Sequence, residues 1–423
     1  MIINENKLLS SGEEALAGAI DIGGKRCIDL GSRTTSLHAQ STACFPTAPS
    51  PSVWHDPVAG RLSQLGQLDL AKGADNLLLT CVAAKPGDRL LIVREDSRHG
   101  YYDCLVSAFV ADRARVLGLR VLEIEVRAPG VDRDLPANLM AAMAKVDHTV
   151  FFARIGDQLR FDGLPGQCSK TMVYAYDAAC LGSGFGTTSH TLMRDVKAYV
   201  DKCLMMTSSI DVTCPLGTEL TGNPLTFNDQ EEGEVKINRF PMTVFKPVPA
   251  TDFSGRIALS RWLIGSGSRY YQPFEAKLDE IVFALLDQGR VVGFEGPSSV
   301  VSKVRAHHVK IGAMFGLDPF SVHSWHAGIH PRTFYPLPAD HNPARWSALA
   351  FGSPRYLHFH VCGDQPPGEI CWTVIDPTIR LDGLPAWEEG RFILAETKEA
   401  KAIMQRYQDG QAAFANPPLE IDI

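Results

Sequence analysis

The sequence predicts two domains, an α/β N-terminal domain with an open parallel sheet and an α+β C-terminal domain with largely antiparallel strands. Three observations support this fold class. The chain has 423 residues, which at roughly 150 residues per domain is enough for two or three domains. Helical and strand-like segments alternate between residues 65 and 210. After residue 210, short β-branched or aromatic runs between Gly/Pro turns dominate.

Residues 1–64 are predicted to form an arm or linker, because Pro46, Pro49 and Pro51 interrupt regular backbone hydrogen bonding there. The α/β domain is expected over residues 65–210. Its predicted helices cover residues 69–83, 102–117 and 135–144, and its predicted strands cover residues 89–93, 120–126 and 149–153. Strands separated by helices pair in parallel with right-handed crossovers, so this region predicts an open sheet.

The α+β domain is expected over residues 211–400, and residues 401–423 are expected to be a C-terminal tail. Predicted strands cover residues 210–213, 239–244, 256–258, 281–286, 290–294, 356–362, 369–375 and 391–395. A helix is predicted over residues 300–315. With few helices between them, these strands are expected to pair mostly antiparallel.

Charge and hydropathy exclude two classes of partner. The chain has 41 Lys plus Arg against 48 Asp plus Glu, a net charge of -7, so no broad basic face is expected and nucleic acid is not a predicted partner. Every apolar run is shorter than the roughly 20 residues that a membrane span needs. The first residues lack the features of a secretion signal, so the sequence predicts a cytoplasmic protein.

Histidine density is the strongest local signal for chemistry. Eight of the 13 histidines lie between residues 307 and 360: His307, His308, His323, His326, His330, His341, His358 and His360. Histidine is a common metal ligand, and a His-x-His pattern on a strand puts both rings on one face. A metal site at His326, His358 and His360 is one interpretation. Histidines that fill polar clefts as hydrogen-bonding spacers are the alternative, because no carboxylate stands at the spacing of a facial triad.

Four further residues are candidates for ligand binding. Arg154 follows a predicted strand and could bind a carboxylate, or it could pair with Asp157. Arg355 precedes the His-x-His strand and could recognise a carboxylate or a peptide C-terminus, with a surface ion pair as the alternative. Trp325 and Tyr356 could form an aromatic wall, although aromatic residues in short strands more often fill a core.

Four motifs in the order found here resemble a known superfamily. They are Lys85-Pro86-Gly87-Asp88, Phe151-Phe152-Ala153-Arg154, Thr213-Cys214-Pro215-Leu216-Gly217 and Gly328-Ile329-His330-Pro331. Residues 65–395 are similar to the superfamily that holds thermophilic leucyl-aminopeptidase-type metalloproteases and 2,5-dihydroxypyridine dioxygenases. The resemblance implies an N-terminal α/β domain, a metal site on a mixed C-terminal domain facing the cleft, and a homodimer or higher homo-oligomer.

The sequence departs from that superfamily at the metal ligands. By the resemblance, a His-x-Asp pair falls on Cys371 and Thr373, and another ligand carboxylate falls on Ser324. A hydroxyl cannot supply the anionic oxygen of a carboxylate, and a lone thiolate disfavours ferrous iron. We therefore expect these three positions to be degenerate and the protein to hold no metal cofactor at them.

Two classes of function remain. The first is a non-catalytic accessory protein that holds a linear ribosomal precursor peptide for a pathway enzyme in natural-product biosynthesis, because the cleft of the aminopeptidase relatives accepts peptides. It resembles the dioxygenase-fold peptide-binding proteins of crocagin biosynthesis. The second is a dioxygenase or hydrolase with Fe(II) or zinc relocated to His326, His358 and His360. The departure at the ligand positions favours the first class.

Overall fold

The computed structural model describes residues 67–131, 135–160, 166–224, 237–364, 368–415 and 419–422. The arm predicted for residues 1–64 lies outside the described residues. In the described parts of the chain, none of the helices combines the length and the apolar character needed to cross a bilayer.

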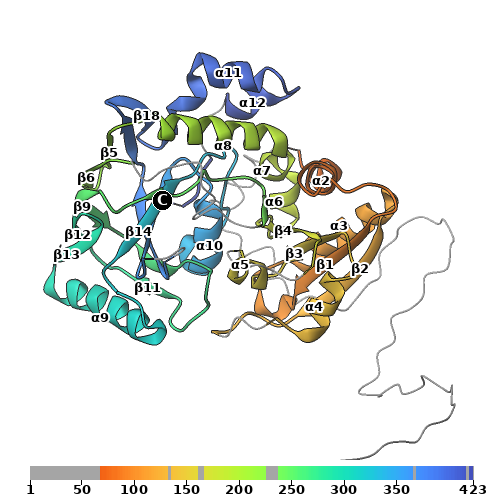
Figure 1. The fold of residues 1–423 in the computed structure, drawn as a ribbon, viewed down its shortest axis with the longest axis horizontal. Helices are drawn as coiled ribbons and strands as arrows, with labels where there is room; N and C mark the ends of the chain where they lie inside the picture. Colours follow the sequence, from red (N-terminus) through yellow and green to blue (C-terminus); the bar gives the residue numbers. More distant parts are fainter. Residues whose placement is uncertain are drawn as a thin grey trace, which may run out of the picture. The chain divides into compact units, whose positions relative to one another are not determined.

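A five-stranded parallel sheet forms the centre of the N-terminal region, in the order β2-β1-β3-β4-β7 (Figure 1). Its strands are β1 (Arg89–Glu95), β2 (Arg120–Val126), β3 (His148–Phe152), β4 (Ser169–Val173) and β7 (Asn238–Phe240). Strand β1 is central and has a continuous apolar run, with Leu90 to Val93 fully buried. Such a run is typical of a parallel strand that is covered on both faces.

Helices accompany this sheet along the chain. They are α2 (Leu70–Asp75), a π-helical segment (Asn76–Cys81), a 3₁₀ turn (Ser97–His99), α3 (Cys104–Val116), α4 (Ala137–Met143), α5 (Ile155–Gln158), α6 (Ala178–Gly182), α7 (Gly184–Thr187) and α8 (His190–Met205). Asp69 and Asp103 cap α2 and α3, accepting hydrogen bonds from the amides of Lys72 and Leu105. The single helix predicted over residues 69–83 is thus α2 continued by a π-helical turn.

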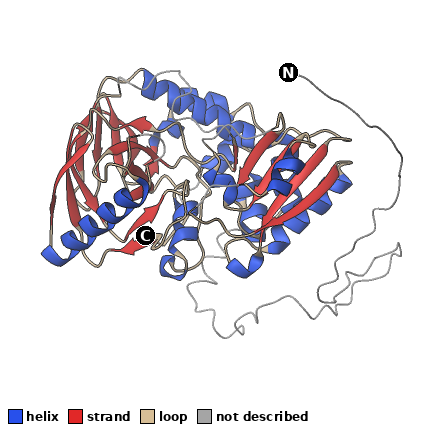
Figure 2. Cartoon of the chain, turned by 60° about the horizontal axis from the view of Figure 1, so that its bottom comes forward, coloured by secondary structure: helices blue, strands red, loops and turns tan. Residues whose placement is uncertain are grey.

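Two antiparallel sheets form most of the C-terminal region (Figure 2). The six-stranded sheet has the order β11-β10-β16-β15-β14-β8, with β8 (Val248–Pro249), β10 (Trp262–Gly265), β11 (Glu275–Lys277), β14 (Val322–Ala327), β15 (Tyr356–Val361) and β16 (Ile370–Ile375). The eight-stranded sheet has the order β13-β12-β9-β6-β5-β17-β18-β19, with β5 (Ile210–Thr213), β6 (Glu219–Gly222), β9 (Ser254–Leu259), β12 (Val282–Asp287), β13 (Arg290–Glu295), β17 (Thr378–Leu381), β18 (Leu384–Glu388) and β19 (Arg391–Phe392).

The remaining helices are α9 (Ser298–Phe315), α10 (Pro343–Ala350), α11 (Lys398–Met404) and α12 (Gly410–Phe414), with 3₁₀ turns at Ala339–His341 and Ile393–Glu396. Helix α9 ends at Gly316, whose φ of +67° suits a glycine. Helix α10 is fixed by the C-terminal segment, because Trp346 donates its indole N–H to the carbonyl of Ile421 at 2.6 Å. Both side chains are fully buried.

The predicted fold class is confirmed, with a parallel sheet and its helices followed by antiparallel sheets. The strand predicted over residues 239–244 differs in one respect. Only its beginning is a strand, β7, and this strand pairs in parallel with β4 rather than with the antiparallel sheets. A segment beyond residue 210 thereby completes the parallel sheet.

Candidate metal centre

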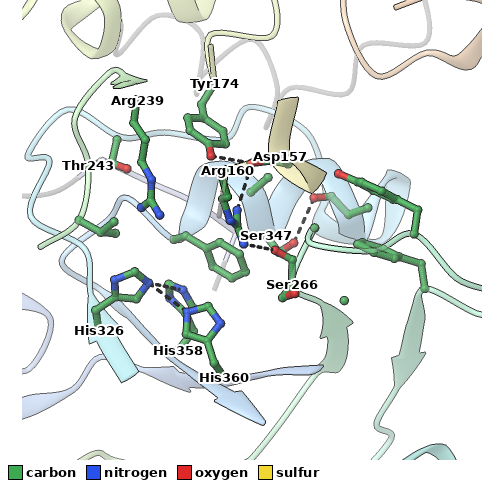
Figure 3. A pocket seen from close by; sticks show the side chains of 18 of the residues that line it. Asp157, Arg160, Tyr174, Arg239, Thr243, Ser266, His326, Ser347, His358 and His360 are labelled. Carbon is green, nitrogen blue, oxygen red and sulfur yellow. Dashed lines mark hydrogen bonds and ion pairs between the residues drawn. The ribbon is translucent and has the colours of Figure 1, made fainter. Parts of the chain in front are cut away.

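Three histidines converge on the buried face of the six-stranded sheet. Alternation along β15 puts His358 and His360 on the same face, and the β14–β15 register sets His326 directly opposite His358. The Nε2 atoms of His326 and His358 are 2.8 Å apart, and those of His326 and His360 are 3.3 Å apart (Figure 3). Among the described residues, these three form the group of side chains with metal-ligand spacing.

Burial keeps the three imidazoles neutral. It lowers the pKa of His326 to about 3, with a smaller contribution from the charge of Arg239. Burial also lowers the pKa values of His358 and His360 well below the ordinary value, and the neighbouring histidines add to the effect. Neutral imidazole is the form that binds metal ions, so no proton has to be displaced from a charged ring.

The hydrogen-bond partner of His326 fixes its tautomer. Its Nδ1 lies 3.0 Å from the carbonyl oxygen of Phe245, and a carbonyl only accepts, so Nδ1 carries the hydrogen. Nε2 therefore presents a lone pair to the other two rings. Such a second contact to a backbone carbonyl is the usual way in which proteins orient a metal-binding histidine.

Two neighbours hold the rings of the β15 histidines. Phe351 stacks on His358, with ring centroids 4.0 Å apart and an interplanar angle of 15°. The Cys371 sulfur lies 3.8 Å from Nδ1 of His360. Burial raises the pKa of the Cys371 thiol to about 12, so the sulfur is protonated. Cys371 thus contacts a candidate ligand and lies outside the group of side chains with metal-ligand spacing.

A cavity lies in front of the three histidines, and its opposite wall comes from the parallel-sheet region. The space not filled by atoms is about 620 Å³, including the part open to solvent. Asp157 of α5 accepts hydrogen bonds from Tyr174 at 2.7 Å and from Arg160 at 3.0 Å. Arg160 also donates to the carbonyl oxygen of Ser266 at 2.8 Å. Arg239 of β7 extends toward the histidines from the same side (Figure 3).

The positions that the sequence marked as degenerate ligands lie next to this cluster. His360 faces Cys371 and His358 faces Thr373 across the β15–β16 pairing, while Ser324 is opposite His360 on β14. The Thr373 hydroxyl is hydrogen-bonded to Tyr356 at 2.6 Å. These three positions and the histidines therefore share one patch of one sheet.

The four predicted ligand-binding residues are not among the described residues that line the cavity. Arg154 pairs with the buried Glu95, to which its Nε donates at 3.0 Å, and not with Asp157. Arg355 forms a two-point ion pair with Asp376 at 2.8 and 2.9 Å. Trp325 and Tyr356 are fully buried in the two hydrophobic cores. A binding role for these four residues stays a prediction.

The other clustered histidines lie outside the cavity lining: His307, His308, His323, His330 and His341. His308 is a hydrogen-bonding spacer. This role is the alternative to metal binding that the sequence left open for the histidines between residues 307 and 360. It accepts from the indole N–H of Trp372 at 2.9 Å, and its Nδ1 donates to the carbonyl of Val304 at 2.8 Å. Both ring nitrogens are occupied, so His308 has a structural role.

Sequence reasoning missed Arg160, Tyr174 and Arg239 as cavity residues. None of them falls in a recognisable motif, and Arg239 reaches the cavity through the pairing of β7 with β4, two strands that are distant in the chain. The signal available in the sequence was weak. Tyr174 follows a strand of the parallel sheet, where ligands of open α/β sheets bind, and Arg239 begins a predicted strand.

The fold and the three-histidine cavity define a protein with one parallel sheet, two antiparallel sheets and a candidate metal centre. The sequence matches no known family model and no curated protein. Among solved structures, 2,5-dihydroxypyridine dioxygenase from Pseudomonas putida KT2440 is similar with a TM-score of 0.54 and 12% identity, covering 79% of this chain and 100% of that chain. Wild-type AmpT from Thermus thermophilus has a TM-score of 0.46 and 13% identity, covering 77% and 98%. The predicted resemblance to the dioxygenase is therefore confirmed for the fold.

Proposed function

We propose that this chain is a metal-dependent enzyme in which His326, His358 and His360 hold a divalent ion. The observation that carries the proposal is the convergence of three buried, neutral Nε2 atoms at the wall of a cavity. This proposal differs from the expectation drawn from the sequence. The degenerate positions Ser324, Cys371 and Thr373 led us to expect a protein without a metal cofactor.

Hydrogen bonding alone does not satisfy this cluster. Nε2 of His326 has one lone pair and can accept one hydrogen bond, yet both other rings face it at 2.8 and 3.3 Å. A cation bound by the three Nε2 lone pairs would occupy all of them at once. With bonds of about 2.0–2.1 Å, tetrahedral nitrogens lie roughly 3.3 Å apart, so His326 and His358 need to separate by about 0.5 Å.

The ligand set favours zinc over Fe(II). Three imidazoles with an open position form one of the catalytic zinc arrangements, whereas many non-haem iron oxygenases use two histidines and a carboxylate. When bound, the ion supplies Lewis acidity to a water or a substrate oxygen. Zinc therefore supports a hydrolase, and Fe(II) supports a dioxygenase like the structural neighbour. Asp157 is the carboxylate among the described cavity residues and is the candidate to accept a proton.

Elemental analysis tests this proposal. Full-length protein purified without chelator and titrated with zinc or Fe(II) is expected to bind one equivalent. His358→Ala and His360→Ala are expected to lose at least about 90% of that metal, because each removes one of three ligands. His341→Ala is the matched control, since His341 is exposed and lies outside the group of His326, His358 and His360.

Unchanged metal binding in the two variants would contradict the proposal. If His358→Ala and His360→Ala retain the fold by circular dichroism and bind as much metal as the wild type, the proposed centre is wrong. The metal that the purified protein contains before titration separates the two reaction types, because hydrolysis and oxygen chemistry depend on different ions.

Peptide holding remains the second candidate, and one feature favours it. In the part of the chain that the structure describes, β7 is an edge strand of the parallel sheet and carries the cavity residue Arg239. An extended peptide could add to such an edge. A dye-labelled linear precursor peptide that binds metal-free protein with a dissociation constant near the micromolar range, roughly -8 kcal/mol, would support this candidate. Metal bound at one equivalent by the three histidines would argue against a purely non-catalytic role.

A further inference from the structure

The thiol of Cys371 is a side-chain partner of one candidate ligand, His360. Cys371 lies on β16 directly opposite His360 in the β15–β16 register and is 1% exposed. Its Sγ lies 3.8 Å from Nδ1 of His360, a separation at which a thiol forms a weak hydrogen bond. The other ring nitrogen, Nε2, is the atom that approaches His326 at 3.3 Å. Cys371 therefore contacts the nitrogen of His360 that is not used for metal binding.

The ring of His360 needs different partners with and without an ion. A neutral imidazole carries one N–H and one lone pair. With the Nε2 lone pair bound to an ion, the ring carries its hydrogen on Nδ1, and this N–H needs an acceptor. With the hydrogen on Nε2 instead, the lone pair is on Nδ1 and needs a donor. His360 is buried, so a ring nitrogen without a partner would destabilise either state.

A thiol meets both needs, whereas the partner of His326 meets only one. The carbonyl oxygen of Phe245 only accepts, so the hydrogen of His326 stays on Nδ1 with or without an ion. The Cys371 thiol is a weak donor through its hydrogen and a weak acceptor through its sulfur. Rotation of its S–H bond therefore changes the thiol from a donor to an acceptor toward the same ring nitrogen.

Contacts within the histidine group leave the tautomer of His360 open. His326 offers one lone pair at Nε2, and His358 is the closer of its two neighbours, at 2.8 Å against 3.3 Å for His360. A hydrogen bond from His358 uses that lone pair. The contact of Nδ1 with Cys371 is then the one that selects between the two tautomers of His360.

We propose that Cys371 is a positioning residue that allows His360 to change tautomer when an ion binds. This inference rests on the metal centre proposed above. In the ion-free state the thiol donates to Nδ1, and the ring hydrogen is on Nε2. On ion binding, the hydrogen of Nε2 leaves as a proton, Nδ1 takes up a proton, and the sulfur becomes the acceptor. The ring stays neutral throughout. A position where the resemblance implies a metal ligand thus supports a ligand on the neighbouring strand.

Zinc affinity of the full-length protein, measured by competition with a chromophoric chelator, tests this role in the loaded state. Cys371→Ala is expected to weaken zinc binding about tenfold, since removing such a partner of a ligating histidine costs about 10–100-fold in affinity. Cys371→Val fills the volume of the thiol without a hydrogen-bonding group, so a similar loss is expected. Cys168→Ala is the matched control, because Cys168 is also a buried thiol and contacts Thr149 of the parallel sheet.

Three outcomes separate this inference from its alternatives. Wild-type zinc affinity in Cys371→Ala and Cys371→Val would overturn it. Recovery of wild-type affinity in Cys371→Val alone would assign the effect to packing and would overturn it as well. Failure of the wild type to bind zinc would instead contradict the metal centre itself.

The tautomer of His360 can also be measured without any ion. Long-range proton–nitrogen correlation spectra of protein with isotope-labelled histidine distinguish a hydrogen on Nε2 from one on Nδ1, and His360→Gln identifies the signal. In the ion-free wild type we expect the hydrogen of His360 on Nε2, and in Cys371→Ala we expect a mixture of both tautomers. A hydrogen on Nδ1 in the ion-free wild type, or the same tautomer in both proteins, would contradict the role of Cys371 whether or not zinc binds.

Discussion

The histidines of the candidate centre lie beside the positions where the resemblance places metal ligands. The positions expected to carry superfamily ligands hold Cys371 and Thr373, and each faces a histidine of β15 across the sheet. The Cys371 thiol is kept protonated by burial, with its pKa raised to about 12. The neighbouring strands β14 and β15 carry the three candidate imidazole ligands. Loss of ligands at one strand therefore does not imply loss of metal binding by the sheet.

Arg154 was predicted to bind a ligand, and its pairing with Glu95 predicts a structural role that can be measured. The Glu95 side chain is 1% exposed and the Arg154 side chain is 15% exposed. Arg154→Met would leave a buried carboxylate without its partner, so we expect a loss of about 3–5 kcal/mol in the free energy of unfolding, measured by urea denaturation.

An exposed ion pair serves as the control for that measurement. Arg391 and Glu396 are 61% and 56% exposed, and Arg391→Met is expected to cost less than about 1 kcal/mol. Similar small losses in both variants would show that Arg154 does not stabilise the fold, and its predicted role in ligand binding would regain support.

Strands with a local sequence pattern could be predicted from the sequence, whereas elements placed by long-range pairing could not. Strands β1, β2 and β15 were predicted to within a few residues, because their apolar runs or His-x-His alternation are local signals. Strand β14, which carries His326, was not predicted. The pairing of β14 with β15 is irregular between Val322 and Ser324, which breaks the two-residue alternation.

The same distinction applies to the centre. The sequence indicated His326, His358 and His360 as candidate ligands from their density, but the pairing that joins them is set by the register of two strands. The cavity wall was not predictable, because Arg239 is placed by the pairing of β7 with β4, which has no local signature, and Arg160 lies in the turn after α5. A loop or strand that depends on tertiary pairing has little periodicity of its own.

The end of β14 gives a prediction at this scale. Gly328 follows β14, and its amide donates to the carbonyl of Tyr356 at 3.0 Å. A Cβ at residue 328 would lie 2.2 Å from the carbonyl oxygen of Ser353, a backbone atom. Gly328→Ala must therefore move β14 relative to β15, and we expect a loss of about 1–3 kcal/mol in the free energy of unfolding and weaker metal binding.

Gly130→Ala is the control for this substitution, because nothing lies within 4 Å of a Cβ at that position. We expect its stability to change by less than about 0.5 kcal/mol, with metal affinity unaffected. Equal metal affinity in Gly328→Ala and the wild type would show that the β14–β15 register does not position His326.

For the whole molecule, metal binding and folding stability should be linked. The three candidate ligands come from β14 and β15, which the unfolded chain does not hold together, so an ion at the proposed centre would bind the native state preferentially. At a free zinc concentration 100 times the dissociation constant, we expect about 2.7 kcal/mol of added stability, measured as a rise in melting temperature that a chelator reverses.

His358→Ala distinguishes this linkage from nonspecific effects of zinc. The variant is expected to melt at the same temperature with and without zinc, whereas His341→Ala should respond like the wild type. A zinc-dependent rise in His358→Ala equal to that of the wild type would assign the effect to another part of the chain. Assembly into a homo-oligomer and a cytoplasmic location stay predictions from the sequence.

The placement of the histidines inside a sheet also affects the rates at which an ion would bind and dissociate. Strand β15 is hydrogen-bonded on both sides, to β14 and β16, and all six of its residues are buried. Backbone amides in such a strand exchange with deuterated solvent only through large-scale opening. An occupant of the centre would therefore leave through the cavity mouth or together with unfolding, and only in the second case would its residence time report on the openings of the entire sheet.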